Sequence, residues 1–129
     1  MIGIDAIADT SAFVAVEHAR PLRMPMPRQL AVSCVTIGEL IAGLLIAPTP
    51  SDQDRRLRTL LRATRLRPLQ VDGQVAQAWA ELRVALRESK RALETNDSWI
   101  AATAIAYRLP LATQDDDYAD IPGLELIRL

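Results

Sequence analysis

The chain has 129 residues, half of them hydrophobic, which suits one compact domain and leaves no room for a second independent core. No apolar run approaches the roughly 18 residues that span a bilayer, and the first residues do not resemble a secretory signal, so we expect a cytoplasmic protein without a membrane segment. The net charge of −1 argues against binding nucleic acid by bulk positive charge, and the single Cys34 excludes an internal disulfide. We therefore expect one domain over residues 1–129.

The first part of the chain predicts a strand, a helix and an irregular segment. Residues 2–8 are an apolar run typical of a buried strand, and this run ends at Asp9. Ser11 is placed to cap a helix that begins near residue 12. Three prolines within residues 21–28 predict an irregular segment after that helix.

A second strand over residues 30–35 is expected to lead into a second helix. Thr36 stands where an N-cap would, and Glu39 follows three residues later, which is the spacing of a capping box. We expect this helix to continue to about residue 47, where Pro48 ends it.

The rest of the chain continues the alternation of helices and strands. Ser51 and Asp54 repeat the capping spacing at the start of a third helix. The remaining expected elements are a strand over 66–71, a long helix capped by Asp72, a helix opened by Thr95 or Asn96, a strand over 111–113, a turn over 115–119 and a strand over 124–129. This alternation predicts an α/β fold, a three-layer sandwich with a mostly parallel central sheet of four to five strands.

Four acidic residues stand near the expected carboxyl ends of the strands. Asp9 follows the first strand, Glu39 and Asp97 are expected in the first turns of their helices, and Asp115 follows the strand over 111–113. Sites in open parallel sheets form in the crevice beyond these strand ends. The topology therefore predicts that all four carboxylates can point into one crevice.

Bringing four carboxylates together requires compensating positive charge. Two of them about 5 Å apart repel by roughly 3 kcal/mol at an effective dielectric constant near 20. Hard oxygen ligands, with no histidine or cysteine among them, favour Mg²⁺ or Mn²⁺ over zinc. Such a cation activates water and neutralises charge at a phosphodiester, so the set predicts metal-dependent hydrolysis of that bond.

Several of these residues also have a simpler structural explanation. Glu39 can complete a capping box, Asp97 can complement a helix N-terminus, and Asp115 with Asp117 can form a turn. His18 is expected to be a surface or structural residue. The arginines of residues 55–67 can form a solvated helix face or contact phosphates or a partner, and the sequence leaves this open.

Four segments resemble the PIN-domain ribonucleases, and within them the VapC toxins of bacterial toxin–antitoxin pairs. The segments are Ala8-Asp9-Thr10-Ser11-Ala12, Val35-Thr36-Ile37-Gly38-Glu39-Leu40, Asn96-Asp97-Ser98-Trp99-Ile100-Ala101-Ala102-Thr103-Ala104 and Leu109-Pro110-Leu111-Ala112-Thr113-Gln114-Asp115-Asp116-Asp117-Tyr118. Their order and spacing extend the resemblance over nearly the whole chain. It implies a PIN-like sandwich.

The resemblance also implies roles for individual residues and for partners. The catalytic, metal-binding quartet falls on Asp9, Glu39, Asp97 and Asp115, and Asp117 matches an additional acid. Ser11 and Thr113 match hydroxyl positions beside the metal or phosphate, and we expect them to position the substrate phosphate. The family implies an endoribonuclease toxin that uses Mg²⁺ or Mn²⁺. It also implies a VapB-type antitoxin, a homodimer and a structured RNA substrate such as a tRNA or rRNA loop.

Two positions depart from the family pattern. Asp5 offers a rival first acid, but Asp9 ends the strand and is followed by Thr-Ser-Ala. Gln114 stands where the family often has a basic residue, which could weaken a phosphate contact.

Three other functions compete with this interpretation. A receiver-type phosphoacceptor would need a lysine after a late strand, whereas the only lysine, Lys90, falls near the end of a long helix. A PIN-like binding scaffold without catalysis, or a magnesium nuclease that acts on DNA, would share the fold.

Overall fold

The computed structural model describes residues 3–129 and contains a five-stranded, entirely parallel sheet. The strands are β1 (Ala6–Ala8), β2 (Leu30–Ser33), β3 (Arg67–Leu69), β4 (Leu111–Thr113) and β5 (Leu126–Arg128). Their order across the sheet is β3-β2-β1-β4-β5, with every neighbouring pair parallel. The chain crosses from one half of the sheet to the other between β3 and β4. The predicted α/β fold is confirmed, with the central strand β1 leading directly to Asp9.

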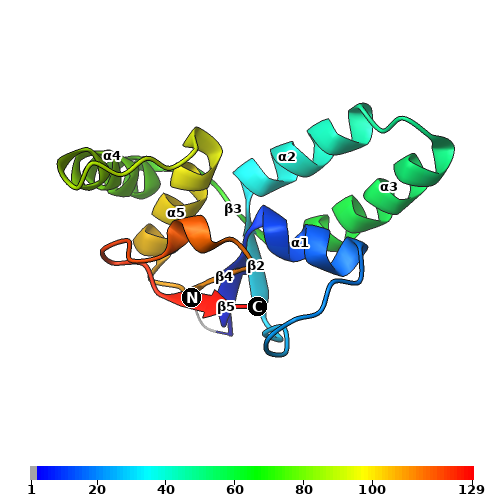
Figure 1. Ribbon diagram of the computed structural model, residues 1–129, viewed down its shortest axis with the longest axis horizontal. Coiled ribbons are helices and arrows are strands. Elements are labelled where there is room, and N and C mark those ends of the chain that lie inside the picture. The colour runs from blue at the N-terminus through cyan, green and yellow to red at the C-terminus, as the bar shows by residue number, and fades with distance from the viewer. Residues whose placement is uncertain (1–2) are drawn as a thin grey trace.

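Helices cover both faces of this sheet. They are α1 (Thr10–Glu17), α2 (Cys34–Leu45), α3 (Pro50–Thr64), α4 (Gly73–Glu88) and α5 (Thr95–Tyr107), with a short 3-10 helix η1 (Asp116–Tyr118) after β4. Figure 1 shows α4 and α5 on one side of the sheet and α1 on the other, while α2 and α3 form a hairpin that extends outward. The result is the three-layer sandwich expected from the alternating pattern.

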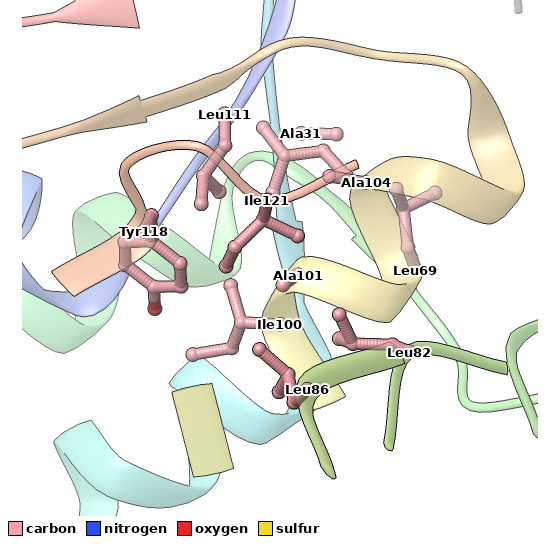
Figure 2. Packing of buried hydrophobic residues seen from close by; sticks show 11 residues of the cluster. Ala31, Leu69, Leu82, Leu86, Ile100, Ala101, Ala104, Leu111, Tyr118 and Ile121 are labelled. Carbon is pink, nitrogen blue, oxygen red and sulfur yellow. The ribbon is translucent and has the colours of Figure 1, made fainter. Parts of the chain in front are cut away.

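The alternation of side chains along β1 divides the core into two parts. Ile7 faces the cluster built with Leu82 of α4 and Ile100 of α5, whereas Ala6 and Ala8 face the cluster on the α1 and α3 side. Figure 2 shows the first cluster, in which Ile100, Leu111 and Tyr118 pack together from three separate segments of the chain. Burial of this apolar surface holds the strand ends, and the residues that follow them, in place.

Three predicted helix caps are wrong, although the helices themselves are present. Asp9, not Ser11, caps α1, and its side chain accepts a hydrogen bond from the Ala12 N–H. Ser33, not Thr36, caps α2, because β2 runs directly into the helix without a linker. Thr49, not Ser51, caps α3, with Pro50 as the first helical residue.

The other predicted boundaries agree with the structure to within a few residues. Asp72 caps α4 and accepts a hydrogen bond from Val75 N–H at 3.0 Å, and Thr95 opens α5. Residue 2, with which the first predicted strand begins, lies outside the described residues. Among residues 3–129, none of the helices combines the length and apolar character that crossing a membrane requires.

Candidate active site

Asp9 is a buried carboxylate held in a fixed orientation. Only 2% of the residue is exposed, and it lies between the end of β1 and the start of α1. Its Oδ1 accepts hydrogen bonds from Ala12 N at 3.0 Å and Ser11 Oγ at 2.7 Å, and its Oδ2 accepts one from Thr113 Oγ1 at 2.6 Å. Burial raises the pKa of Asp9, these hydrogen bonds oppose the rise, and the negative charge of Asp115 adds to it.

Thr113 and Ser11 connect this carboxylate to the segment after β4. The Thr113 hydroxyl donates to Asp9 and accepts a hydrogen bond from Asp115 N at 2.9 Å. Ser11 Oγ donates to Asp9 and accepts from Gln114 N at 2.9 Å. Both hydroxyls orient the Asp9 carboxylate, and their expected role beside a substrate phosphate stays a prediction. The Gln114 side chain turns to the proline-rich segment, where its Nε2 donates to the Pro21 carbonyl oxygen at 3.0 Å.

Glu39 reaches the same end of the sheet from α2. It is the sixth residue of that helix, so it lies in the second turn and forms no capping box with Thr36. Its Oε1 accepts a hydrogen bond from Thr10 Oγ1 at 2.6 Å, which joins α2 to the first residue of α1. Thr36 is buried within α2, and its hydroxyl accepts from the same Thr10 at 3.2 Å.

Asp97 provides the clearest sign that the acids lie near one another. It lies in the first turn of α5, and its Oδ1 accepts a hydrogen bond from the Tyr118 hydroxyl at 3.1 Å. Burial raises the pKa of Asp97 to about 6, and the charges of Asp115, Glu39 and Glu94 add to the rise, while the Tyr118 hydrogen bond opposes it. The charges of two other predicted site carboxylates, Asp115 and Glu39, therefore contribute to the raised pKa of Asp97, and the charge of Asp115 contributes to that of Asp9.

Tyr118 belongs to the site, although sequence reasoning assigned it no function. Its side chain is 1% exposed, and burial together with the charges of Asp9 and Asp97 raises the pKa of its hydroxyl. The hydroxyl therefore stays protonated and donates to Asp97 at neutral pH. The sequence does show an aromatic residue at the end of an acidic turn. That pattern is equally compatible with a residue of the hydrophobic core, so it did not identify Tyr118 as part of the site.

Other candidate residues lie apart from this group. Asp117 is exposed, and only its backbone joins the site, where its N–H donates to Asp115 Oδ1 at 2.9 Å. Asp5 precedes β1, at the opposite end of the strand from Asp9, and its carboxylate accepts from Gln29 N. His18 ends α1 at the surface and lies 3.1 Å from Glu17, as expected for a structural residue. Lys90 follows α4 and not a strand, so the lysine of a receiver domain is missing here.

The carboxylates lie near the carboxyl end of the sheet but do not form a closed cage. Within residues 3–129, no three histidine, cysteine, aspartate or glutamate side chains lie close enough together to enclose an ion. Mg²⁺ usually keeps several water ligands and is held by one or two carboxylates together with substrate phosphates, so it does not require such a cage. The oxygen-only set of Asp9, Glu39, Asp97 and Asp115 fits a hydrated Mg²⁺ or Mn²⁺, and not zinc.

A sheet of this topology, with acidic residues at its carboxyl end, defines the class to which the chain belongs. The family model described as PIN domain matches residues 6–124, and the chain therefore belongs to the PIN-domain family. It is 45% identical to ribonuclease VapC4 and 42% identical to ribonuclease VapC5, both of Mycobacterium tuberculosis. The first alignment covers 96% of each chain, and the second covers 95% of this chain and 94% of the relative.

A solved structure supports a narrower placement. The crystal structure of VapBC-5, a toxin–antitoxin system of M. tuberculosis, contains a chain that superposes with a TM-score of 0.88 at 39% identity, covering 97% of this chain and 98% of the other. Within the PIN-domain family, the protein belongs to the VapC ribonucleases, the toxins of VapBC toxin–antitoxin systems. The family predicted from the sequence motifs is confirmed.

Proposed function

We propose that the protein is a Mg²⁺- or Mn²⁺-dependent endoribonuclease toxin that hydrolyses a phosphodiester bond in structured RNA, such as a tRNA or rRNA loop. The observation that carries this proposal is the hydrogen-bonded arrangement at the carboxyl end of the sheet, where Thr113 joins Asp9 to the backbone of Asp115 and Tyr118 donates to Asp97. Burial and, to a smaller extent, the neighbouring carboxylates raise the pKa of Asp97. Negative side chains gathered at one end of a sheet favour a hard cation, which relieves their repulsion. Membership in the VapC ribonucleases supports RNA as the substrate class.

The four carboxylates lie in different environments, so we expect them to contribute differently to binding of the cation. Asp9, Glu39, Asp97 and Asp115 would hold the cation, and when bound it supplies an activated water nucleophile and positive charge at the scissile phosphate. Asp9 is prevented from rotating by hydrogen bonds to both of its oxygens. Asp97 is oriented from one side by Tyr118, which leaves its other oxygen available to a ligand. Asp117 is exposed and would contact the cation or substrate only from the rim of the site.

Single-stranded loops of folded RNA are the form of substrate that we propose. Sequence-specific recognition of RNA mostly targets loops and bulges, because their bases and backbone are accessible there. An open site at the end of a sheet can admit such a strand, whereas a deep enclosed cavity would not. Mapping RNA ends after brief induction of the wild type, compared with Asp9→Asn, would identify the loop and the cleavage site.

The hairpin of α2 and α3 carries the surface that best suits an antitoxin. Leu45 and Ile46 are 78% and 77% exposed, and Ile41 of α2 and Leu57 and Leu61 of α3 are also exposed. Exposed apolar side chains gathered in this way mark protein–protein interaction sites. We propose that a VapB-type antitoxin covers them. The homodimer implied by the family resemblance stays a prediction, which analytical ultracentrifugation of the purified chain would test.

The proposed activity is tested with matched RNA and DNA hairpin oligonucleotides incubated with Mg²⁺, Mn²⁺ or EDTA. We expect RNA cleavage that requires the cation and disappears in Asp9→Asn, while the matched exposed substitution Asp54→Asn keeps it. Cleavage of DNA alone would assign the site to another nuclease class. Absence of cleavage of either polymer, in cells as well as with these oligonucleotides, would favour the non-catalytic scaffold.

A further inference from the structure

A basic pocket of about 520 Å³ lies between α4 and the loop that leads to α5. Arg83 and Arg87 line it from α4, and Arg91 lines it from the loop. The other lining residues are Val84, Leu86, Ala92, Leu93 and Thr95, so none of the described residues that form the pocket is acidic. We call this feature the arginine pocket.

The three arginines lack the acidic partners that usually accompany such a series. They are spaced four residues apart in the sequence, and within α4 Arg83 and Arg87 face each other and not a carboxylate, while Arg91 lies in the loop that follows. Like charges at this spacing destabilise a helix by a few tenths of a kcal/mol per pair. In the part of the chain that the structure describes, none of them forms an ion pair: Arg83 lies over the ring of Trp79 at 5.1 Å, and Arg91 donates to the backbone carbonyl oxygens of Asp117 and Asp120.

The arginines of α3 provide the contrast. Arg55 lies 2.6 Å from Asp52, and Arg58 lies 2.8 Å from Asp54, so these charges are balanced within their own helix. A solvated, internally paired helix face explains these two members of the arginine run. Other arginines of that run, such as Arg62 and Arg65, form no ion pair among the described residues either, so the arginine pocket is distinguished by its contact with η1 and its position at the start of α5.

The pocket adjoins the candidate active site through two shared elements. Thr95, which lines it, is the first residue of α5, and Asp97 follows two residues later. Arg91 contacts the Asp117 carbonyl oxygen in η1, the same short helix that carries Tyr118. Figure 1 shows α4 lying beside α5, and Thr95 places part of the pocket lining at the end of α5 that carries Asp97.

We propose that the arginine pocket binds a phosphate group of the RNA strand adjacent to the cleaved linkage. This inference rests on the proposed function. Carboxylates at the cleavage site repel the RNA backbone, and a basic pocket nearby offsets that repulsion. Guanidinium groups bind phosphate oxygens through paired hydrogen bonds, and the apolar part of the lining can contact the sugar or base. Arg83 and Arg87 supply the exposed charges, while Arg91 connects the loop to η1.

The test measures binding and cleavage separately. Binding of a fluorescein-labelled hairpin oligoribonucleotide is followed by anisotropy in EDTA over a series of salt concentrations, for the wild type, Arg83→Gln, Arg87→Gln and the control Arg58→Gln. Each phosphate contact to a single strand contributes about 0.7 to the slope of log K against log salt concentration. We expect Arg87→Gln to reduce the slope by about that amount and to weaken binding by roughly 3–10-fold, with Arg83→Gln in the same direction. Arg58→Gln, which removes the same charge from α3, should leave the slope unchanged.

Two results would overturn the inference. Equal losses in Arg58→Gln and Arg87→Gln would assign the effect to overall charge, and unchanged slopes in both pocket variants would show that the pocket does not contact RNA. A cleavage assay of the wild type with Mg²⁺ keeps the two proposals apart: if the wild type cleaves RNA while the pocket variants bind normally, only the arginine pocket inference fails. Melting temperatures of all variants control for folding.

Discussion

Replacing Asp97 by asparagine should make the metal-free protein more stable and inactive. The carboxylate has a pKa of about 6 in the folded protein, against an ordinary value of 3.8. Each pKa unit corresponds to 1.36 kcal/mol, so the shift amounts to about 3 kcal/mol before any correction. Asp97 is partly exposed, and solvent screening reduces this to about 1–2 kcal/mol. Asparagine keeps the oxygen that accepts from Tyr118, so the hydrogen bond to α5 survives.

The pH dependence of this effect has a definite sign. Between about pH 4 and pH 6 the folded protein holds a proton on Asp97 that the unfolded chain has released, so stability falls as pH rises through this window. The penalty is complete above about pH 6 and vanishes towards pH 4. Asp97→Asn should therefore exceed the wild type in stability at pH 7.5, by roughly 3–8 °C in melting temperature, and the difference should close on acidification.

The assay is thermal unfolding in EDTA at a series of pH values. Asp54→Asn is the matched control, because this exposed carboxylate on α3 pairs with Arg58 at 2.8 Å, and its loss should change stability by at most about 1 kcal/mol in the unfavourable direction. If Asp97→Asn is no more stable than the wild type at pH 7.5, or if its advantage persists at pH 4, burial and the neighbouring charges do not raise the pKa of Asp97 as described.

Three further predictions concern the hydroxyl network, the cation and the partner. Thr113→Val removes the hydroxyl that bonds Asp9 and Asp115 N, and it should cost about 1.5–3 kcal/mol in urea unfolding, whereas Thr64→Val at an exposed position should cost much less. Mg²⁺ at ten times its Kd should stabilise the wild type by about 1.4 kcal/mol but not Asp97→Asn, and equal stabilisation of both would place the cation elsewhere. Leu45→Glu should abolish neutralisation by the antitoxin and leave RNA cleavage intact, with Val71→Glu as the exposed control; retained neutralisation would exclude the α2–α3 surface.

The positions of Asp9 and Asp115 could be anticipated because each follows a strand of the sheet, and that of Asp97 because it lies at the start of a predicted helix. Strands that alternate with helices form parallel sheets, and residues that follow the strands then gather at one end. The capping residues could not be assigned in the same way. Ser33 and Thr36 are both able to cap α2, and the choice depends on where β2 ends, which its pairing with β1 and β3 determines.

The roles of Tyr118 and of the arginine pocket could not be predicted from local sequence patterns, because both depend on contacts between separate segments of the chain. The hydrogen bond between Tyr118 and Asp97 joins residues 21 apart and depends on how η1 packs against α5. The four-residue spacing of Arg83, Arg87 and Arg91 is visible in the sequence, but the pocket exists only because the loop before α5 folds back against α4. The denser arginine run of residues 55–67 drew the prediction, and the pocket formed by Arg83, Arg87 and Arg91 was missed.

Binding of Mn²⁺, followed by electron paramagnetic resonance during titration of the metal-free protein, tests whether these carboxylates hold a cation. We predict that the wild type and Asp54→Asn bind Mn²⁺ alike and that Mg²⁺ competes for the same site. Asp97→Asn should bind at least tenfold more weakly. Equal affinity of Asp97→Asn and the wild type would contradict the assignment of Asp97 as a ligand, and absence of binding to the wild type would contradict the metal-dependent mechanism as a whole.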